Sequence, residues 1–448
     1  MGENKCYTLF ARKVAMIKTT KDFQQSQLSQ GQKVGVVNLG CARNLVDSQE
    51  ILGRLKRNGH KIVDMQKADV AIVNTCAFIE EAKQESIETI LDLVGLKRQG
   101  KIKKVIVAGC LAQRYGKELA QEIKEIDAIV GVPTFSKDGV ADQVYLTPRH
   151  FVYVKICESC YNRCSFCAIP KIKGKFFSRT SESILSEIKT LDAKGVKEIN
   201  IIGQDITAYG MDLYHEKSLA RLLKEMVKVL HNIEWIRLLY AFPAHVTDEL
   251  IAAMANEEKI CKYIDMPLQH VSDNVLLSMN RGITTQGTKD LIQKLRTRIP
   301  TASLRTTFIV GLPGETEENF SELVQFTRQT RFEKLGVFVY SQEEGTEAYA
   351  MPDQVAAMTK KKRLRTLMRE QQKISKELQN RFIGKRLKVL IEEGQKGDGH
   401  IYLGRTEYDA PDVDGVVYVH SKKKLLPGNF VTVEVTDTLE YDLTGEVV

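Results

Sequence analysis

The 448-residue sequence predicts an α/β protein in three successive parts: a doubly wound α/β domain, a partial barrel of six strand–helix units, and a small all-β barrel. Three observations support this prediction. Buried-looking apolar runs alternate with helical segments up to about residue 358. Short strand-like runs separated by turns fill the C-terminal part. Six of the nine cysteines form two groups of three, each next to strand-like runs.

The first domain is predicted to span residues 33–143, after a polar N-terminal tail over residues 1–32. Three apolar runs end at cysteines: 34–40 before Cys41, 70–75 before Cys76 and 105–109 before Cys110. Helical periodicity follows each run, so the strands should be parallel and their carboxyl ends should share one edge of the sheet. Ligands bind at that edge in open α/β sheets, and we expect the three thiols to converge there.

The second domain is predicted over residues 147–358. Its strand-like runs are 151–156, 198–202, 235–241, 263–268, 304–311 and 335–340, with helices predicted at 184–193, 219–230, 248–256, 289–298 and 317–330. Serial strand–helix units favour a partial (β/α)6 barrel, in which chemistry occurs at the carboxyl ends of the strands. The second trio, Cys160, Cys164 and Cys167, follows the first strand at that end.

A charged helix and a small barrel complete the chain. Residues 359–382 carry many lysines and arginines but also an apolar face, which favours a solvated linker helix over a nucleic-acid contact, the alternative. Runs at 387–391, 401–405, 416–419 and 430–436 predict a small all-β barrel over residues 383–448.

The composition excludes several classes of protein. Hydrophobic residues make up 43% and charged residues 27% of the chain, as in ordinary globular proteins. No apolar run has the roughly 20 residues that cross a bilayer, and the N-terminus lacks a secretory signal, so we expect a cytoplasmic protein without a membrane partner. An odd number of cysteines argues against a disulfide framework. Outside the trios, Cys6 is expected in the tail, Cys157 at a strand end and Cys261 in the core.

Each trio has one ligand too few for a four-iron cluster held only by protein. Such a cluster usually takes four thiolates, so three leave one iron open to an external ligand. A structural zinc site is the alternative, but it normally needs four protein ligands and no fourth lies nearby in the sequence. Two iron–sulfur clusters are therefore predicted, on Cys41, Cys76 and Cys110 and on Cys160, Cys164 and Cys167.

The second trio, with Phe166 before its last cysteine, resembles the cysteine loop of the radical S-adenosylmethionine superfamily. Residues 307–316 (TFIVGLPGET) resemble the strand and turn that contact the adenosine in that superfamily, and Gly203 follows the second strand where a glycine-containing stretch lies near the methionine. The resemblance implies that S-adenosylmethionine binds the open iron. It assigns cofactor-binding roles to Phe166, Gly203, Thr307, Ile309 and Gly311. It assigns no catalytic side chain beyond the cluster ligands.

The first trio lies in motifs that resemble the methylthiotransferase family: NLGCARN (38–44), NTCAF (74–78) and AGCLAQ (108–113). The resemblance extends over everything after residue 32 and implies a radical S-adenosylmethionine domain and a C-terminal TRAM domain. It implies two [4Fe-4S] clusters, the first presenting sulfur and the second generating a radical that abstracts hydrogen from the substrate. Ser159 stands where this family usually has glycine.

Three stretches resemble the branch that modifies the β-carbon of an aspartate in the ribosomal protein uS12: residues 204–210, residues 265–272, and residues 404–406 with 410–415. Charge gives a separate argument. Residues 383–448 carry eight basic and twelve acidic residues, a net of −4 within a chain of +8, and an acidic barrel suits a basic protein better than RNA. The expected partners are uS12, an electron donor of flavodoxin or ferredoxin type and a sulfur donor, without a direct nucleic-acid substrate. A tRNA adenosine as substrate, and a non-catalytic iron–sulfur carrier, remain alternatives.

Overall fold

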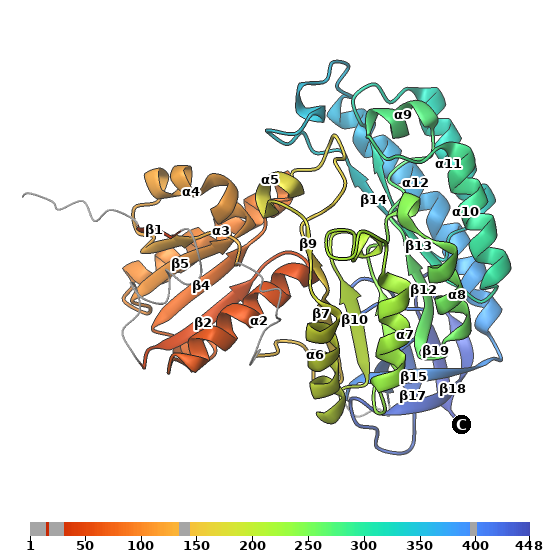
Figure 1. Cartoon of the computed structure of the whole chain (residues 1–448), viewed down its shortest axis with the longest axis horizontal. Helices are drawn as coiled ribbons and strands as arrows, with labels where there is room; N and C mark the ends of the chain where they lie inside the picture. Colours follow the sequence, from red (N-terminus) through yellow and green to blue (C-terminus); the bar gives the residue numbers. More distant parts are fainter. Residues whose placement is uncertain (1–14, 18–30, 134–143, 395–400) are drawn as a thin grey trace, which may run out of the picture. The chain divides into compact units, whose positions relative to one another are not determined.

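The computed structural model describes residues 15–17, 31–133, 144–394 and 401–448 of the chain, which is drawn in Figure 1. Two compact units make up these residues, one reaching Val144 and the other running from Tyr145 to Val448. None of the helices in these ranges combines the length and apolar character that a bilayer crossing demands.

The first unit contains a six-stranded parallel sheet in the order β1-β6-β5-β4-β2-β3. Its strands are β1 (Ala15–Ile17), β2 (Lys33–Asn38), β3 (Lys61–Ile62), β4 (Val70–Thr75), β5 (Lys104–Gly109) and β6 (Ala128–Val130). Its helices are α2 (Ala42–Arg57), α3 (Glu80–Arg98) and α4 (Cys110–Glu122), with the short η1 (Met65–Lys67). Residues 15–17, which the sequence predicts as part of a tail, pair with β6. Cys6 lies outside the described residues.

Burial explains why these strands could be recognised as continuous apolar runs. Strand β4 is buried along its whole length, as expected for a central parallel strand covered on both faces. Val34, Ile72 and Ile106 of three adjacent strands pack in one core with α2. The sheet is thus held by apolar side chains, and its carboxyl edge is left for polar residues and cysteines.

The second unit begins with six parallel strands in the order β14-β13-β12-β11-β10-β7. They are β7 (Phe151–Lys155), β10 (Glu198–Ile202), β11 (Trp235–Leu238), β12 (Ile260–Asp265), β13 (Ser303–Val310) and β14 (Lys334–Val339). The helices are α5 (Ile169–Lys173), α6 (Ser181–Ala193), α7 (Leu219–Val229), α8 (Asp248–Asn256), α9 (Asp273–Ser278), α10 (Thr285–Arg298), α11 (Glu317–Thr330) and α12 (Ala357–Gln379). Strands β8 (Cys157–Glu158) and β9 (Phe177–Ser178) form a small ribbon. The predicted partial barrel is confirmed.

The two faces of this sheet differ in character. On β10, Ile199 and Ile201 join the apolar core shared with the helices, whereas Glu198 and Asn200 alternate with them and are fully buried on the other face. The same alternation continues on the other strands. This polar face includes Tyr153, Glu198, Asn200, Arg237, Tyr263, Arg305 and Lys334.

The C-terminal part is a closed barrel in the order β15-β16-β17-β19-β18, as the all-β prediction requires. Its strands are β15 (Arg386–Glu393), β16 (Ile401–Thr406), β17 (Val417–His420), β18 (Phe430–Thr438) and β19 (Leu443–Val447). Strand β19 does not appear in the sequence prediction, since Gly445 interrupts its pattern. That glycine is required: a Cβ there would lie 2.4 Å from the carbonyl oxygen of Glu434.

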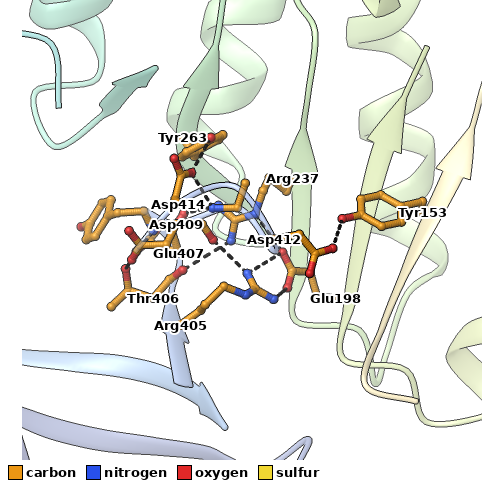
Figure 2. A network of polar contacts seen from close by, with 12 residues as sticks. Tyr153, Glu198, Arg237, Tyr263, Arg405, Thr406, Glu407, Asp409, Asp412 and Asp414 are labelled. Carbon is orange, nitrogen blue, oxygen red and sulfur yellow. Dashed lines mark hydrogen bonds and ion pairs between the residues drawn. The ribbon is translucent and has the colours of Figure 1, made fainter. Parts of the chain in front are cut away.

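A buried ion-pair network joins the C-terminal barrel to the polar face of the six-stranded sheet (Figure 2). Glu198 of β10 accepts hydrogen bonds from Arg237 of β11 at 2.8 Å and from Arg405 of β16 at 2.5 Å. Arg405 also reaches Glu392 at 2.7 Å. Because Glu198 and both arginines are almost completely buried, each arginine needs this carboxylate as its counter-charge.

The loop after β16 adds acidic side chains to the same polar face (Figure 2). The Tyr263 hydroxyl donates to Asp414 at 2.7 Å, the Tyr153 hydroxyl to Asp412 at 3.1 Å, and Lys334 pairs with Asp409 at 2.5 Å. Asp409 and Asp414, which also pairs with Arg305 at 3.5 Å, thus face cations of the same chain, whereas Asp437 and Glu446 of the barrel are exposed. The net charge of residues 383–448 therefore does not by itself measure the charge that the barrel offers to a partner.

We expect Glu198→Ala to destabilise the second unit strongly, since it leaves Arg237 and Arg405 buried without a counter-charge. Breaking such a pair costs about 3–5 kcal/mol, measurable as the free energy of unfolding in urea. The control is Glu434→Ala, whose partner Arg386 is 67% exposed, and it should cost less than about 1 kcal/mol. Equal losses in the two variants would contradict the prediction.

Candidate functional site

The first cysteine trio lies along the carboxyl edge of three adjacent strands. Strands β2 and β4 pair Asn38 with Asn74, and β4 and β5 pair Thr75 with Gly109, so the strand ends are level. Cys41 caps the start of α2, Cys76 follows β4, and Cys110 opens α4. The predicted placement of all three cysteines at one edge agrees with this register.

Asn44 ties the three cysteine segments together, a role that the sequence analysis missed. Its side-chain nitrogen donates to the carbonyl oxygens of Leu39 and Thr75, both at 3.0 Å, and its side-chain oxygen accepts from the Cys110 thiol at 3.7 Å. One amide therefore contacts the residues before Cys41 and Cys76 as well as Cys110 itself. The asparagine is 2% exposed, so its geometry is set by these partners.

The backbone around Cys41 and Cys76 is equally close-packed. Gly40 has φ +86°, and a Cβ there would lie 2.9 Å from the Cβ of Cys76. Ser86 accepts a hydrogen bond from the Cys76 nitrogen at 3.1 Å and donates to its carbonyl oxygen at 2.9 Å. Any larger residue at position 40 would push the two cysteines apart.

The thiols of this trio differ electrostatically. Burial raises the pKa of Cys41, but the charge of Arg43 and its hydrogen bond to the sulfur at 3.4 Å outweigh it, so the pKa lies below its usual value. Burial raises the pKa of Cys76, and the neighbouring Cys41 thiolate adds to the effect. Thiolates are the metal-binding form, and Arg43 favours that form at Cys41.

The second trio lies in the loop after β7 and β8, entered through a residue with unusual backbone geometry. Ser159 has φ 62°, in the left-handed region that favours glycine, at the position where the related family usually has glycine. Its hydroxyl donates to the carbonyl oxygen of Gly174 at 2.6 Å. The strained turn is thus held by a side-chain bond that glycine could not make.

Hydrogen bonds from distant segments hold the cysteine loop. The backbone nitrogen of Ser165 donates to the carbonyl oxygen of Met279 at 3.1 Å, and its hydroxyl donates to the carbonyl oxygen of Ser278 at 2.7 Å. The Ala348 nitrogen donates to the Ser165 carbonyl at 2.9 Å. The segment between Cys164 and Cys167 is therefore fixed by residues more than one hundred positions away.

Two polar side chains contact the sulfurs themselves. Arg281 donates to the Cys164 sulfur at 3.4 Å, and its guanidinium lies 4.1 Å from the ring centroid of Phe242. Asn162 donates to the Cys160 sulfur at 3.6 Å and to Asp205 at 2.8 Å. Sequence analysis missed these residues, because nothing in their local pattern indicates a partner so far along the chain.

Asp205 is the centre of a small polar group beside Cys160. It is fully buried, and Nδ1 of His245 lies 2.8 Å from Oδ2, the same oxygen that accepts from Asn162. Burial and the Asp205 charge raise the pKa of Cys160 to about 11 despite the hydrogen bond from Asn162. A bound iron would replace that proton.

The predicted cofactor residues lie at the carboxyl ends of the strands. Phe166 and Ile309 pack in one apolar cluster, and Thr307 lies on β13, where its carbonyl accepts from Gln269 at 2.8 Å. The two glycines lie close to other side chains of this chain. A Cβ on Gly203 would lie 2.4 Å from the Cys157 sulfur, and a Cβ on Gly311 would lie 2.3 Å from Cγ of Lys360. Their lack of a side chain is therefore already required by packing within the chain.

Several buried polar atoms near these strand ends have no hydrogen-bond partner. They are the side-chain oxygens of Gln204 and Gln269, the Nε of Arg281 and the hydroxyl of Tyr340. An unsatisfied buried polar atom costs about 1–3 kcal/mol, so these four are poised for a polar ligand. Amide, guanidinium and hydroxyl groups fit the amino, carboxylate and ribose groups of S-adenosylmethionine.

The cysteines do not form a site for a single ion. Nowhere in the described ranges do three or more Cys, His, Asp or Glu side chains surround one metal position. A four-iron cluster has a different requirement, since each thiolate binds a separate iron. Three cysteines on one short loop, with donors aimed at two of the sulfurs, fit that larger group.

Three protein families match successive parts of the chain. Residues 33–131 match the Uncharacterized protein family UPF0004, residues 154–327 the Radical SAM superfamily and residues 383–448 the TRAM domain. The radical SAM match covers the second trio, and the UPF0004 match covers the first.

Curated relatives match almost the full chain. A ribosomal protein uS12 methylthiotransferase RimO from Caldanaerobacter subterraneus subsp. tengcongensis is 48% identical over 438 residues, which cover 92% of this chain and 99% of the relative. Proteins of the same name from Desulforamulus reducens and Clostridioides difficile are 47% and 45% identical, covering 92% and 93% of this chain and 99% and 98% of the relatives. At this identity over nearly the whole length, the chain belongs to the RimO family of radical S-adenosylmethionine methylthiotransferases.

Proposed function

We propose that the chain transfers a methylthio group to the β-carbon of an aspartate in the ribosomal protein uS12. The observation that carries this proposal is the full-length similarity to uS12 methylthiotransferases, together with two cysteine trios that each lie at the carboxyl ends of parallel strands. The radical SAM match assigns an iron–sulfur cluster and S-adenosylmethionine as cofactors.

Two [4Fe-4S] clusters are part of this proposal. Cys160, Cys164 and Cys167 would hold the cluster that binds S-adenosylmethionine, and Cys41, Cys76 and Cys110 would hold the second. When bound, these groups supply radical generation and an activated sulfur. The support on the protein side is the three-ligand donor set of each trio and its polar anchoring by Asn44 or by Arg281.

The side chains around the second trio would orient the cofactor. Arg281 places positive charge beside Cys164, and its free Nε can take a carboxylate oxygen. Gln204 and Gln269 offer amide oxygens to an amino group, and the Tyr340 hydroxyl can bond a ribose. Phe166 and Ile309 would pack against the adenine, as the family resemblance implies. None of these groups is assigned a proton transfer.

The remaining partners follow from the chemistry. Reductive cleavage of S-adenosylmethionine requires an electron donor, proposed as a flavodoxin or ferredoxin, and insertion of sulfur requires a sulfur donor. A ribosomal-protein substrate supports a cytoplasmic location.

Anaerobic turnover tests the substrate. The reconstituted chain would receive S-adenosylmethionine, sulfide and a strong reductant, with uS12 and unmodified tRNA offered separately and analysed by mass spectrometry. We expect a methylthio mass gain on one aspartate of uS12. A gain on a tRNA adenosine instead would overturn the substrate, and cluster absorbance without formation of 5′-deoxyadenosine would indicate a carrier protein.

Iron content tests the two-cluster assignment. The reconstituted wild-type chain should hold about eight irons, and Cys76→Ala and Cys164→Ala should each retain about half of them. Only Cys164→Ala should lose cleavage of S-adenosylmethionine. Cys261→Ala, at a buried core cysteine, is the matched control and should keep the full iron content. Full iron content in either trio variant would refute that trio as a ligand set.

A compensating pair tests the packing at Gly203. Gly203→Ala places a methyl group 2.4 Å from the Cys157 sulfur and should weaken S-adenosylmethionine binding by about tenfold or more, because β10 must shift at its end. Cys157→Ala removes that sulfur, so the double variant should bind within about threefold of wild type in a dialysis assay. If the double variant binds as poorly as Gly203→Ala, the methyl group itself blocks the ligand.

A further inference from the structure

Helix α12 carries far more positive than negative charge. Its sequence contains eight lysines and arginines against two glutamates, a net of 8 − 2 = +6. Two of these cations bind other parts of the same chain. Arg363 is buried and donates to Glu315 at 3.0 Å, and Lys360 donates to the Tyr340 carbonyl oxygen at 3.0 Å. The other cations lie on the outer side of the helix.

Neither glutamate of the helix is free to neutralise them. Glu370 pairs with Arg328 of α11 at 2.9 Å and with Lys373 at 3.4 Å, and Glu377 pairs with Arg331 at 2.7 Å. Five cations remain exposed and enter no ion pair with the residues that the structure describes. We call them the basic stripe: Lys361, Lys362, Arg365, Arg369 and Lys376.

The basic stripe follows one face of the helix. Lys361, Arg365 and Arg369 are spaced by four residues, which places them one above another, and Lys376 lies two turns further on. The distance from residue 361 to residue 376 is about 22 Å at 1.5 Å per residue. Leu367 and Ile374 are buried on the opposite face, so the helix is anchored and the stripe faces outward.

A surface hollow of about 470 Å³ lies next to the stripe. Arg369, Lys376, Gln372 and Thr366 line it, together with the already paired Glu370 and Lys373 and with Glu440 of the C-terminal barrel. The helix end is fixed to that barrel, because Gln379 donates to the Tyr441 carbonyl at 2.8 Å. The stripe is thus a rigid surface rather than a loose charged segment.

A row of fixed, uncompensated cations fits a row of regularly spaced anions. Phosphates of a nucleic-acid backbone provide such a row, and contacts to them dominate binding affinity. Of the acidic residues of the C-terminal barrel, Asp409 and Asp414 are paired with Lys334 and Arg305, and Glu440 is the one that lines the hollow beside the stripe. We infer that the basic stripe binds ribosomal RNA beside the substrate protein, so that the enzyme acts preferentially on uS12 within the assembled small subunit. The identity of the RNA rests on the proposed function.

The test compares two substrates and two charge-matched variants of the full-length reconstituted protein. The stripe variant carries Lys361→Gln, Arg365→Gln and Arg369→Gln. The control carries Lys224→Gln, Lys228→Gln and Lys289→Gln, which remove the same charge from exposed positions on α7 and α10. Each protein would receive isolated uS12 or unmodified assembled small subunits at about 150 mM salt, a physiological ionic strength.

We expect the stripe variant to modify isolated uS12 within about twofold of wild type but to lose about tenfold or more on assembled subunits. The control should match wild type on both. Fluorescence anisotropy with a labelled fragment of small-subunit ribosomal RNA gives a readout that needs no turnover. There, the slope of log affinity against log salt should fall by about 2, since three phosphate contacts are lost.

Three results would overturn the inference: unchanged RNA affinity in the stripe variant, equal losses in the control, or a loss on isolated uS12 as large as on the subunits. The last result would assign the stripe to a protein contact. If wild type modifies neither substrate, the proposed function fails, and the anisotropy measurement still decides whether the stripe binds RNA.

Discussion

The level carboxyl ends of neighbouring parallel strands are the constraint on which both candidate sites depend. Parallel strands cannot be joined by tight turns, so each strand end is followed by a loop or helix start that is free to carry function. In the first unit this geometry brings Cys41, Cys76 and Cys110 to one edge, although the pairing of the strands involves none of them. In the second unit the cysteine loop contacts the ends of β10 and β13, since Asn162 donates to Asp205 and Phe166 packs in one cluster with Ile309.

The two trios meet this constraint with different chemistry. In the first, the neutral amide of Asn44 connects all three cysteine segments, and the Arg43 guanidinium contacts the Cys41 sulfur. In the second, the Arg281 guanidinium contacts the Cys164 sulfur, and Asn162 bridges the Cys160 sulfur and the buried Asp205 carboxylate. Each trio thus has a guanidinium against one of its sulfurs, Arg43 at Cys41 and Arg281 at Cys164, and hydrogen bonds to sulfur are one of the factors that set cluster potentials.

Sequence patterns predicted the architecture and the cysteines, but not the residues that hold them. Strands such as β4 are buried on both faces and leave an unmistakable apolar run, and three cysteines within one short loop are visible by spacing alone. Arg281 and Cys164 are 117 positions apart, and no local period connects them. Strand β19 was missed because a glycine demanded by a neighbouring backbone weakens its pattern. Net charge does not reveal which side chains face inward, so the pairing of Asp409 with Lys334 and of Asp414 with Arg305 could not be predicted.

The carboxylate of Glu198, which Arg237 and Arg405 share, also limits which parts of this protein can be exchanged with those of relatives. Arg405 comes from the C-terminal barrel, while Glu198 lies 207 residues earlier in the sequence and Arg237 lies 39 residues after Glu198. The six-stranded sheet and the C-terminal barrel resemble separate modules in sequence, yet both contribute charged side chains to one buried ion-pair network. If the C-terminal barrel is exchanged with that of a relative that lacks this pair, either Arg405 is moved without Glu198 or Glu198 is left without Arg405. Recombination in this family is therefore expected to preserve the pair together, and an engineer building chimeras must move both halves of the network at once.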